Sequence, residues 1–144
     1  MKTLRLQATM ENLPEAIDFI KGELEALSMP SEAVHALELS CEEIIVNVFN
    51  YAYKDTAMGE IELGVEVNPE TDEIRVRLKD WGRKFDILSH PEPDVAAPLE
   101  QRGKGGLGIF LAKQLMNEIL YDHDGTSNTV TLVKHIAKQG GTES

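Results

Sequence analysis

The sequence predicts a two-layer α+β fold, in which helices cover one face of a β-sheet. Three observations favour this fold: strand-like alternation near both ends of the chain, two helical patterns in the first third, and a β-hairpin after them. A chain of 144 residues fits one compact domain and can bury a core. We expect that domain to span residues 1–137 and a polar tail to occupy residues 138–144.

The N-terminal part combines one strand with two helices. Residues 3–9 alternate between apolar and polar side chains, which is typical of a strand. A first helix should begin at Asn12, which can cap it, with Pro14 in the first turn, and should end near Leu27. A second helix is expected over residues 31–53.

The C-terminal part predicts a hairpin, a long loop, a helix and a strand. The hairpin should pair residues 59–67 with residues 73–78. Residues 80–106 are rich in proline and glycine and show little periodicity, and a loop of this length in a compact domain is usually functional or disordered. A third helix fits residues 107–118, and a last strand fits residues 129–135.

The composition argues against several classes of function. The 25 acidic and 14 basic residues give a net charge of −11, which disfavours nucleic acid because its binding needs cations that neutralise phosphates. No apolar run reaches the roughly 18 residues of a membrane span, and the first residues lack a signal-peptide pattern. Cys41 is the one cysteine, so no intramolecular disulfide can form. We expect a cytoplasmic protein that binds neither nucleic acid nor membranes.

The second predicted helix carries a polar pair on a face that also bears apolar residues. Glu43, Asn47 and Asn50 lie opposite its apolar face, and Leu39 and Ala36 share their side. An enclosed carboxylate is unfavourable unless it is paired or has a task, which favours a site where Asn47 offers an oxygen to Mg²⁺ and Glu43 acts as a base. The alternative is a solvated polar pair on an ordinary amphipathic helix.

An aspartate follows the second hairpin strand directly. Asp80 stands at the strand end, and Gly82 comes two residues later. The carboxylate could accept a hydrogen bond from an adenine amino group at the floor of a pocket, and the glycine would let the backbone approach closely. A plain Asp-x-Gly turn is the alternative.

Glycines cluster where the third predicted helix begins. Backbone N–H groups at a helix N-terminus can bind phosphates, and Arg102 and Lys104 add positive charge there. No Gly-Lys-Ser/Thr sequence ends the cluster, so it is not a Walker A loop. A flexible entry loop to the helix is the alternative. The glycines are Gly103, Gly105, Gly106 and Gly108.

The order and spacing of these elements resemble the ATPase superfamily shared by gyrase, Hsp90, histidine kinases and MutL. Glu43-Ile44-Ile45-Val46-Asn47 is similar to its N box, the segment 80–86 to its G1 box, and Gly106-Leu107-Gly108 to its G2 box. Within the superfamily the chain looks most like the RsbW/SpoIIAB branch of anti-sigma factor/serine-protein kinases. The resemblance implies a Bergerat-type sandwich with a mostly antiparallel mixed sheet and helices on one face.

The resemblance also implies a residue-by-residue ATP site. Glu43 would be the catalytic base, Asn47 would bind Mg²⁺, and Asp80 would accept a hydrogen bond from adenine. Residues 87–105 would form the ATP lid. Within it, Arg102 and Lys104 are candidates for contacts with the phosphates because of their position, not because of a motif match. The nucleotide-binding residues would be Asn47, Asp80, Gly82, Phe85, Arg102, Lys104, Gly105, Gly106, Leu107 and Gly108.

Members of this branch phosphorylate a serine on a STAS-domain antagonist, many bind a sigma factor, and they commonly form homodimers. The resemblance therefore implies these partners for this chain. Tyr51 departs from the histidine that many relatives carry there. The alternative function is a non-catalytic, ATP-responsive module that sequesters a regulator, which Glu43 disfavours because a pure binder needs no base.

Overall fold

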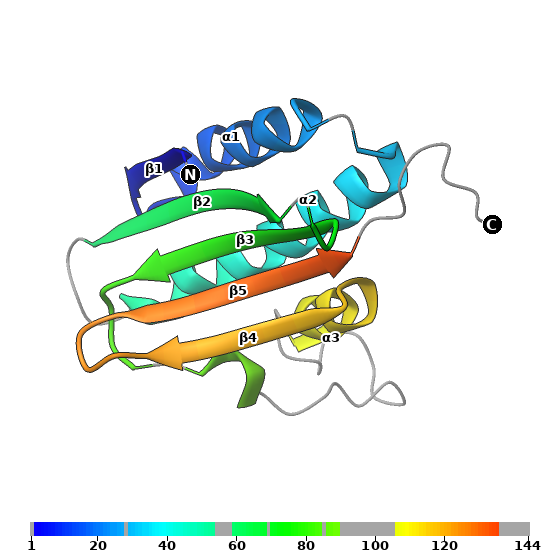
Figure 1. Cartoon of the computed structure of the whole chain (residues 1–144). Coiled ribbons are helices and arrows are strands. Elements are labelled where there is room, and N and C mark those ends of the chain that lie inside the picture. The colour runs from blue at the N-terminus through cyan, green and yellow to red at the C-terminus, as the bar shows by residue number, and fades with distance from the viewer. Residues whose placement is uncertain are drawn as a thin grey trace.

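The computed structural model forms one five-stranded antiparallel sheet with helices on one of its faces (Figure 1). The strand order is β1-β2-β3-β5-β4, and every pairing among these strands is antiparallel, without the parallel pair of a mixed sheet. The expected α+β fold class is confirmed. The structure describes residues 2–27, 29–53, 59–68, 70–84, 86–89 and 106–135.

The elements follow the predicted order, with one additional strand. The strands are β1 (Lys2–Gln7), β2 (Glu60–Asn68), β3 (Glu73–Asp80), β4 (Glu118–His123) and β5 (Asn128–His135). The helices are α1 (Leu13–Glu25), α2 (Ser31–Asn47) and α3 (Gly106–Leu115), with a π-helical turn η2 (Val48–Ala52) continuing α2. Two short 3₁₀ helices, η1 (Met10–Asn12) and η3 (Ile87–Ser89), complete the described elements.

The core lies between the sheet and α2. Every second residue of β3 faces inward, so that Ile74, Val76 and Leu78 are buried while the residues between them lie on the other face. The apolar face of α2 is buried against this layer, as its spacing predicts. Each large aliphatic side chain buried here stabilises the fold by about 1.5–3 kcal/mol relative to an exposed one. The buried α2 side chains include Leu37, Cys41, Ile44 and Ile45.

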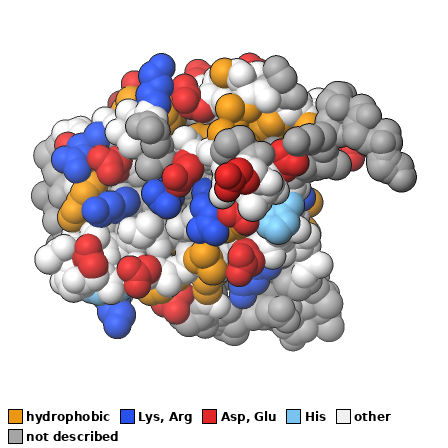
Figure 2. All heavy atoms as spheres, in the orientation of Figure 1, with side chains coloured by type: hydrophobic (Ala, Val, Ile, Leu, Met, Phe, Trp, Pro, Cys, Tyr) orange, Lys and Arg blue, Asp and Glu red, His pale blue; other side chains and the backbone are white. Residues whose placement is uncertain are grey.

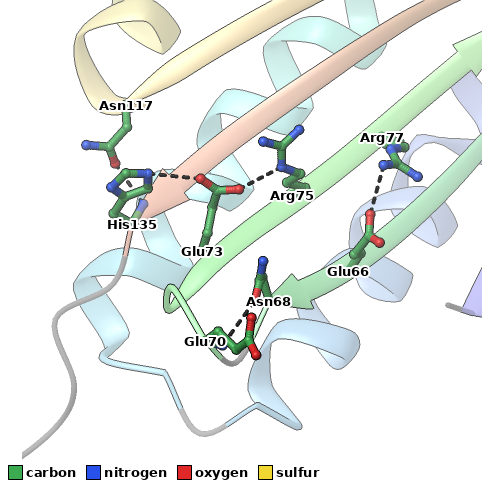
Figure 3. Close-up of polar contacts among 8 residues, drawn as sticks. All are labelled: Glu66, Asn68, Glu70, Glu73, Arg75, Arg77, Asn117 and His135. Carbon is green, nitrogen blue, oxygen red and sulfur yellow. Dashed lines mark hydrogen bonds and ion pairs between the residues drawn. The ribbon is translucent and has the colours of Figure 1, made fainter.

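The opposite face of the sheet is charged. Lys and Arg side chains are interspersed with Asp and Glu across it (Figure 2). Glu73 accepts a hydrogen bond from Arg75 Nε at 2.8 Å and lies 3.1 Å from His135 Nε2, while Arg77 pairs with Glu66 at 2.9 Å (Figure 3). This face is therefore the solvent side of the two-layer fold, and the helical side holds the core.

The start of α1 differs in detail from the prediction. Pro14 stands in the first turn as expected, and Ala16, Ile20 and Leu24 recur at helical spacing and are buried. Asn12 precedes the helix, but its side chain makes no capping bond. It instead donates a hydrogen bond to the backbone oxygen of Gln7 at 2.9 Å, so the side chain ties the helix start to β1.

The strand β4 corrects the expected length of the third helix. That helix was predicted through residue 118, but α3 ends at Leu115 and β4 begins at Glu118. Lys134 Nζ donates to the backbone oxygen of Leu115 at 2.7 Å, and the His135 N–H donates to Asn117 Oδ1 at 2.8 Å. Contacts from the neighbouring strand β5 thus stabilise the helix end, and local periodicity does not reveal them.

Several expectations fall outside the described residues. These are the tail at 138–144, the domain boundary before it, and most of the predicted lid at 87–105, of which η3 is described. No helix among the described segments is long and apolar enough to cross a membrane.

Candidate nucleotide-binding site

The polar pair of α2 lies at the C-terminal end of the helix. Asn47 is buried, with 2% of its surface exposed, and its Nδ2 donates to the backbone oxygen of Glu43 at 2.7 Å. None of the described residues donates a hydrogen bond to Asn47 Oδ1, so the amide oxygen stays available as a hard ligand. The π-helical turn η2 follows at once, a geometry often found at functional sites.

Glu43 is partly buried one turn before Asn47. Burial raises the pKa of the Glu43 carboxyl, and the neighbouring Glu42 raises it further. A carboxylate whose pKa is shifted toward the working pH is better suited to proton transfer than a fully solvated one. Its environment is therefore compatible with the predicted role of base.

Asp80 is the second buried polar centre. It ends β3 with 3% of its surface exposed, and its Oδ1 accepts hydrogen bonds from the Gly82 N–H and from Asn128 Nδ2, each at 2.9 Å. Burial raises the pKa of Asp80, and these two hydrogen bonds oppose that shift. No donor to Oδ2 occurs within the described part of the chain. One carboxylate oxygen is thus fixed by the protein and the other can accept from a ligand.

The structure explains why position 82 is a glycine by a contact within the protein, whereas the sequence predicted a contact with the ligand. A Cβ added at Gly82 would lie 2.2 Å from the backbone oxygen of Ala52, in η2. The N–H of Arg83 donates to that same oxygen at 2.9 Å. Glycine is needed here because the loop after Asp80 packs directly on the end of the α2 segment.

Tyr53 forms a second link between these two segments. Its hydroxyl accepts the Trp81 N–H at 2.7 Å and donates to the backbone oxygen of Glu60 at 2.6 Å. The end of η2 is therefore hydrogen-bonded to the first residue of β2 and to the residue that follows β3, so the loop after Asp80 is held against the end of the α2 segment.

The glycine cluster is described only in part. α3 begins at Gly106, within the glycine cluster that was predicted to bind phosphates at a helix N-terminus. This helix packs against α2. The backbone of Gly106, Leu107 and Gly108 forms the first turn of α3. The other predicted contacts, Phe85, Arg102, Lys104 and Gly105, lie outside the described residues.

The donor set fits Mg²⁺ bound through a nucleotide better than a site made by protein alone. The described residues contain no group of three or more His, Cys, Asp or Glu that could hold a metal. Mg²⁺ commonly takes one or two protein oxygens and completes its shell with phosphates and water. Asn47 Oδ1 is one such oxygen, and it lacks a donor among the described residues.

Comparison with known proteins identifies the family. Residues 6–134 match the family model described as a histidine kinase-like ATPase domain. The chain belongs to this family. Serine-protein kinase RsbW of Listeria monocytogenes serovar 1/2a is 32% identical over 139 residues, covering 93% of this chain and 86% of that protein. The predicted resemblance to RsbW-type proteins is confirmed.

Further relatives carry the same name. RsbW of Oceanobacillus iheyensis is 27% identical over 128 residues, covering 83% of this chain and 77% of that protein. RsbW of Staphylococcus epidermidis is 27% identical over 142 residues, covering 94% and 87% of the two chains. The similarity to these RsbW proteins therefore spans most of the chain, and the matched family model includes both buried polar centres.

The sequence did not predict the roles of three residues in the hydrogen bonds around the candidate site. Asn128 and Tyr121 belong to strands, and Tyr53 follows a helix, so each looks locally like a structural residue. The sequence feature that could have indicated such a role is the polar pair Ser127-Asn128, which stands at the start of a strand whose other residues are mostly buried. Their roles depend on strand register, which residue spacing alone does not give.

Proposed function

We propose that this chain is an ATP-dependent protein-serine kinase and anti-sigma regulatory factor of the RsbW type. The observation that carries the proposal is the buried Asp80 carboxylate, with one oxygen available, linked through Gly82 and Ala52 to the helix that bears Glu43 and Asn47. The names of the relatives, serine-protein kinase RsbW, support the same activity.

The proposed reaction transfers the γ-phosphoryl group of ATP to a serine. The serine oxygen attacks the γ-phosphorus, the bond to the β–γ bridging oxygen breaks, ADP leaves, and the serine proton passes to Glu43. Asp80 accepts a hydrogen bond from the adenine amino group, and Asn47 Oδ1 holds Mg²⁺. Mg²⁺, when bound, neutralises phosphate charge. The first backbone N–H groups of α3 donate to the phosphates.

The partners are part of the same proposal. The resemblance to the RsbW/SpoIIAB branch favours a STAS-domain antagonist as the phosphorylated protein, a sigma factor as a second partner, and a homodimer as the working form. The net charge of −11 is compatible with a basic partner surface and disfavours nucleic acid. A cytoplasmic location follows from the same branch.

The test combines labelled ATP with a candidate STAS-domain partner. Wild-type protein should transfer label to a partner serine, and Glu43→Gln should lose about 10²–10⁴-fold in rate while binding ATP normally. Glu38→Gln is the matched control, because it lies on α2 but about 140° around the helix from Glu43. Transfer at the wild-type rate by Glu43→Gln would remove Glu43 from the role of base.

Phosphoryl transfer, measured beside nucleotide binding, separates this proposal from a non-catalytic module. A protein that binds ATP in calorimetry but transfers no label to any candidate partner would be the ATP-responsive binding module. A protein that binds no ATP at all would refute both functions.

A further inference from the structure

Asn128 connects the carboxylate of Asp80, the proposed adenine contact, to strand β4. It begins β5 directly opposite Asp80 in the sheet register, and only 2% of its surface is exposed. Its Nδ2 donates to Asp80 Oδ1 and to the backbone oxygen of Arg83, each at 2.9 Å. Its Oδ1 accepts a hydrogen bond from the Tyr121 hydroxyl at 2.5 Å. The amide therefore binds the carboxylate, the following loop and a tyrosine at once.

These partners allow one orientation of the Asn128 amide. The two N–H bonds point to two oxygens that can only accept, those of the Asp80 carboxylate and the Arg83 carbonyl. A flipped amide would place its own oxygen against both acceptors. Tyr121, as a hydroxyl donor on the other side, further stabilises the observed orientation.

The orientation of Asn128 determines which face Asp80 presents to a ligand. Asp80 Oδ1 takes both protein donors, from Asn128 and Gly82, while no described residue donates to Oδ2. An ionised Oδ2 can accept from a 6-amino purine but repels the 6-oxo group of hypoxanthine or guanine. A protonated carboxyl could donate to the 6-oxo group, and burial of Asp80 favours that neutral form.

We propose that Asn128, oriented by Tyr121, is a positioning residue that sets purine specificity: it keeps Asp80 an ionised acceptor, so the site takes 6-amino and rejects 6-oxo purine nucleotides. The inference rests on the proposed nucleotide site and deepens it. Among the described residues, His123, which lies on β4 opposite Asn128, lowers the pKa of Asp80, and Asp80 in turn raises the pKa of Tyr53 at the end of η2.

The test measures the ratio of ITP to ATP dissociation constants by calorimetry at one pH. ITP carries a 6-oxo group in place of the 6-amino group. Wild type should prefer ATP by about 10²-fold, as expected for one hydrogen bond to a charged group against a repulsive contact. Asn128→Leu, of nearly the same volume, should lower that ratio by about 10-fold or more because Asp80 loses a donor.

Two further variants keep the test decisive. Tyr121→Phe, which removes only the hydroxyl, should lower the ratio by roughly 3-fold even if Asn128→Leu fails to fold. Thr129→Val is the matched control, because Thr129 pairs with Lys79 on the charged face of the sheet and should leave the ratio unchanged.

The outcomes separate this inference from the proposed function. If wild type prefers ATP and both variants weaken ATP and ITP by equal factors, Asn128 and Tyr121 are merely structural and the inference fails while the nucleotide site stands. If wild type binds ATP and ITP equally, the inference fails. If wild type binds neither nucleotide, the proposed function fails and the inference with it.

Discussion

The Tyr53 hydroxyl accepts the backbone N–H of Trp81 at 2.7 Å, across 28 positions of sequence. Through this contact the end of the helical segment that carries Asn47 is bound to the residue next to Asp80. The predicted metal ligand and the predicted adenine contact therefore lie on two segments that this hydrogen bond joins into one unit.

Tyr53→Phe should loosen that unit. The change leaves the Trp81 N–H and the Glu60 oxygen without their partner, so the free energy of unfolding should fall by about 1–2 kcal/mol. ATP affinity should fall several-fold because Asp80 is held less firmly. Urea denaturation measures the first effect. Fluorescence of Trp81, the single tryptophan, measures the second. Wild-type values for both would mean that the loop keeps its position without Tyr53.

Gly82→Ala should destabilise the fold because a Cβ would meet the backbone of Ala52 at 2.2 Å. We expect a loss of about 1–3 kcal/mol, typical of overpacking, measured by chemical denaturation. Gly22→Ala is the control: nothing lies within 4 Å of its Cβ position in α1, so it should stabilise the protein by up to about 1 kcal/mol. Equal effects of the two substitutions would contradict the close approach of loop and helix.

Asp80→Asn should reverse the preference for the base. Both protein donors bind Oδ1, so the new amide should keep its oxygen there and turn its NH₂ group toward the nucleotide. ATP should weaken by about 10²-fold, whereas ITP should gain affinity. Calorimetry with both nucleotides tests this, with the exposed Asp122→Asn on β4 as the control. Unchanged ATP affinity would overturn the assignment of Asp80 to adenine.

Glu43→Gln should raise stability at neutral pH while it removes phosphoryl transfer. The folded state raises the pKa of Glu43, mainly by burial, so the folded protein holds this proton more tightly than the unfolded chain. The carboxyl therefore lowers the free energy of unfolding as pH rises above its unfolded pKa. Glutamine carries no charge and avoids that loss.

Denaturation curves at two pH values test the sign of this effect. The stability gain of Glu43→Gln over wild type should be present at pH 7, should shrink as pH falls through the raised folded-state pKa of Glu43, and should be gone below the unfolded pKa of glutamate, about 4.3. A gain that is larger in acid than at neutral pH would show that Glu43 is stabilised, not strained, as a carboxylate. Glu38→Gln again provides the comparison on the same helix.

Much of the fold could be predicted because it depends on local patterns. The apolar faces of α1 and α2 follow from residue spacing, since each helix buries one stripe of its own sequence. The hairpin of β2 and β3 follows from alternation around a polar turn. β4 was missed because this edge strand leaves Leu120 exposed and Tyr121 half-buried, so its pattern is weak, and its place depends on pairing with β5.

The sequence by itself determined the fold class, the helix with Glu43 and Asn47, and the candidacy of Asp80, because periodicity and motif spacing lie within short stretches of chain. Only the tertiary structure decided that Gly82 packs on Ala52, that Tyr53 bonds to Trp81, and that Asn128 holds Asp80. Those contacts join residues 28 to 48 positions apart, and they exist only once the strand order and register bring the partners together.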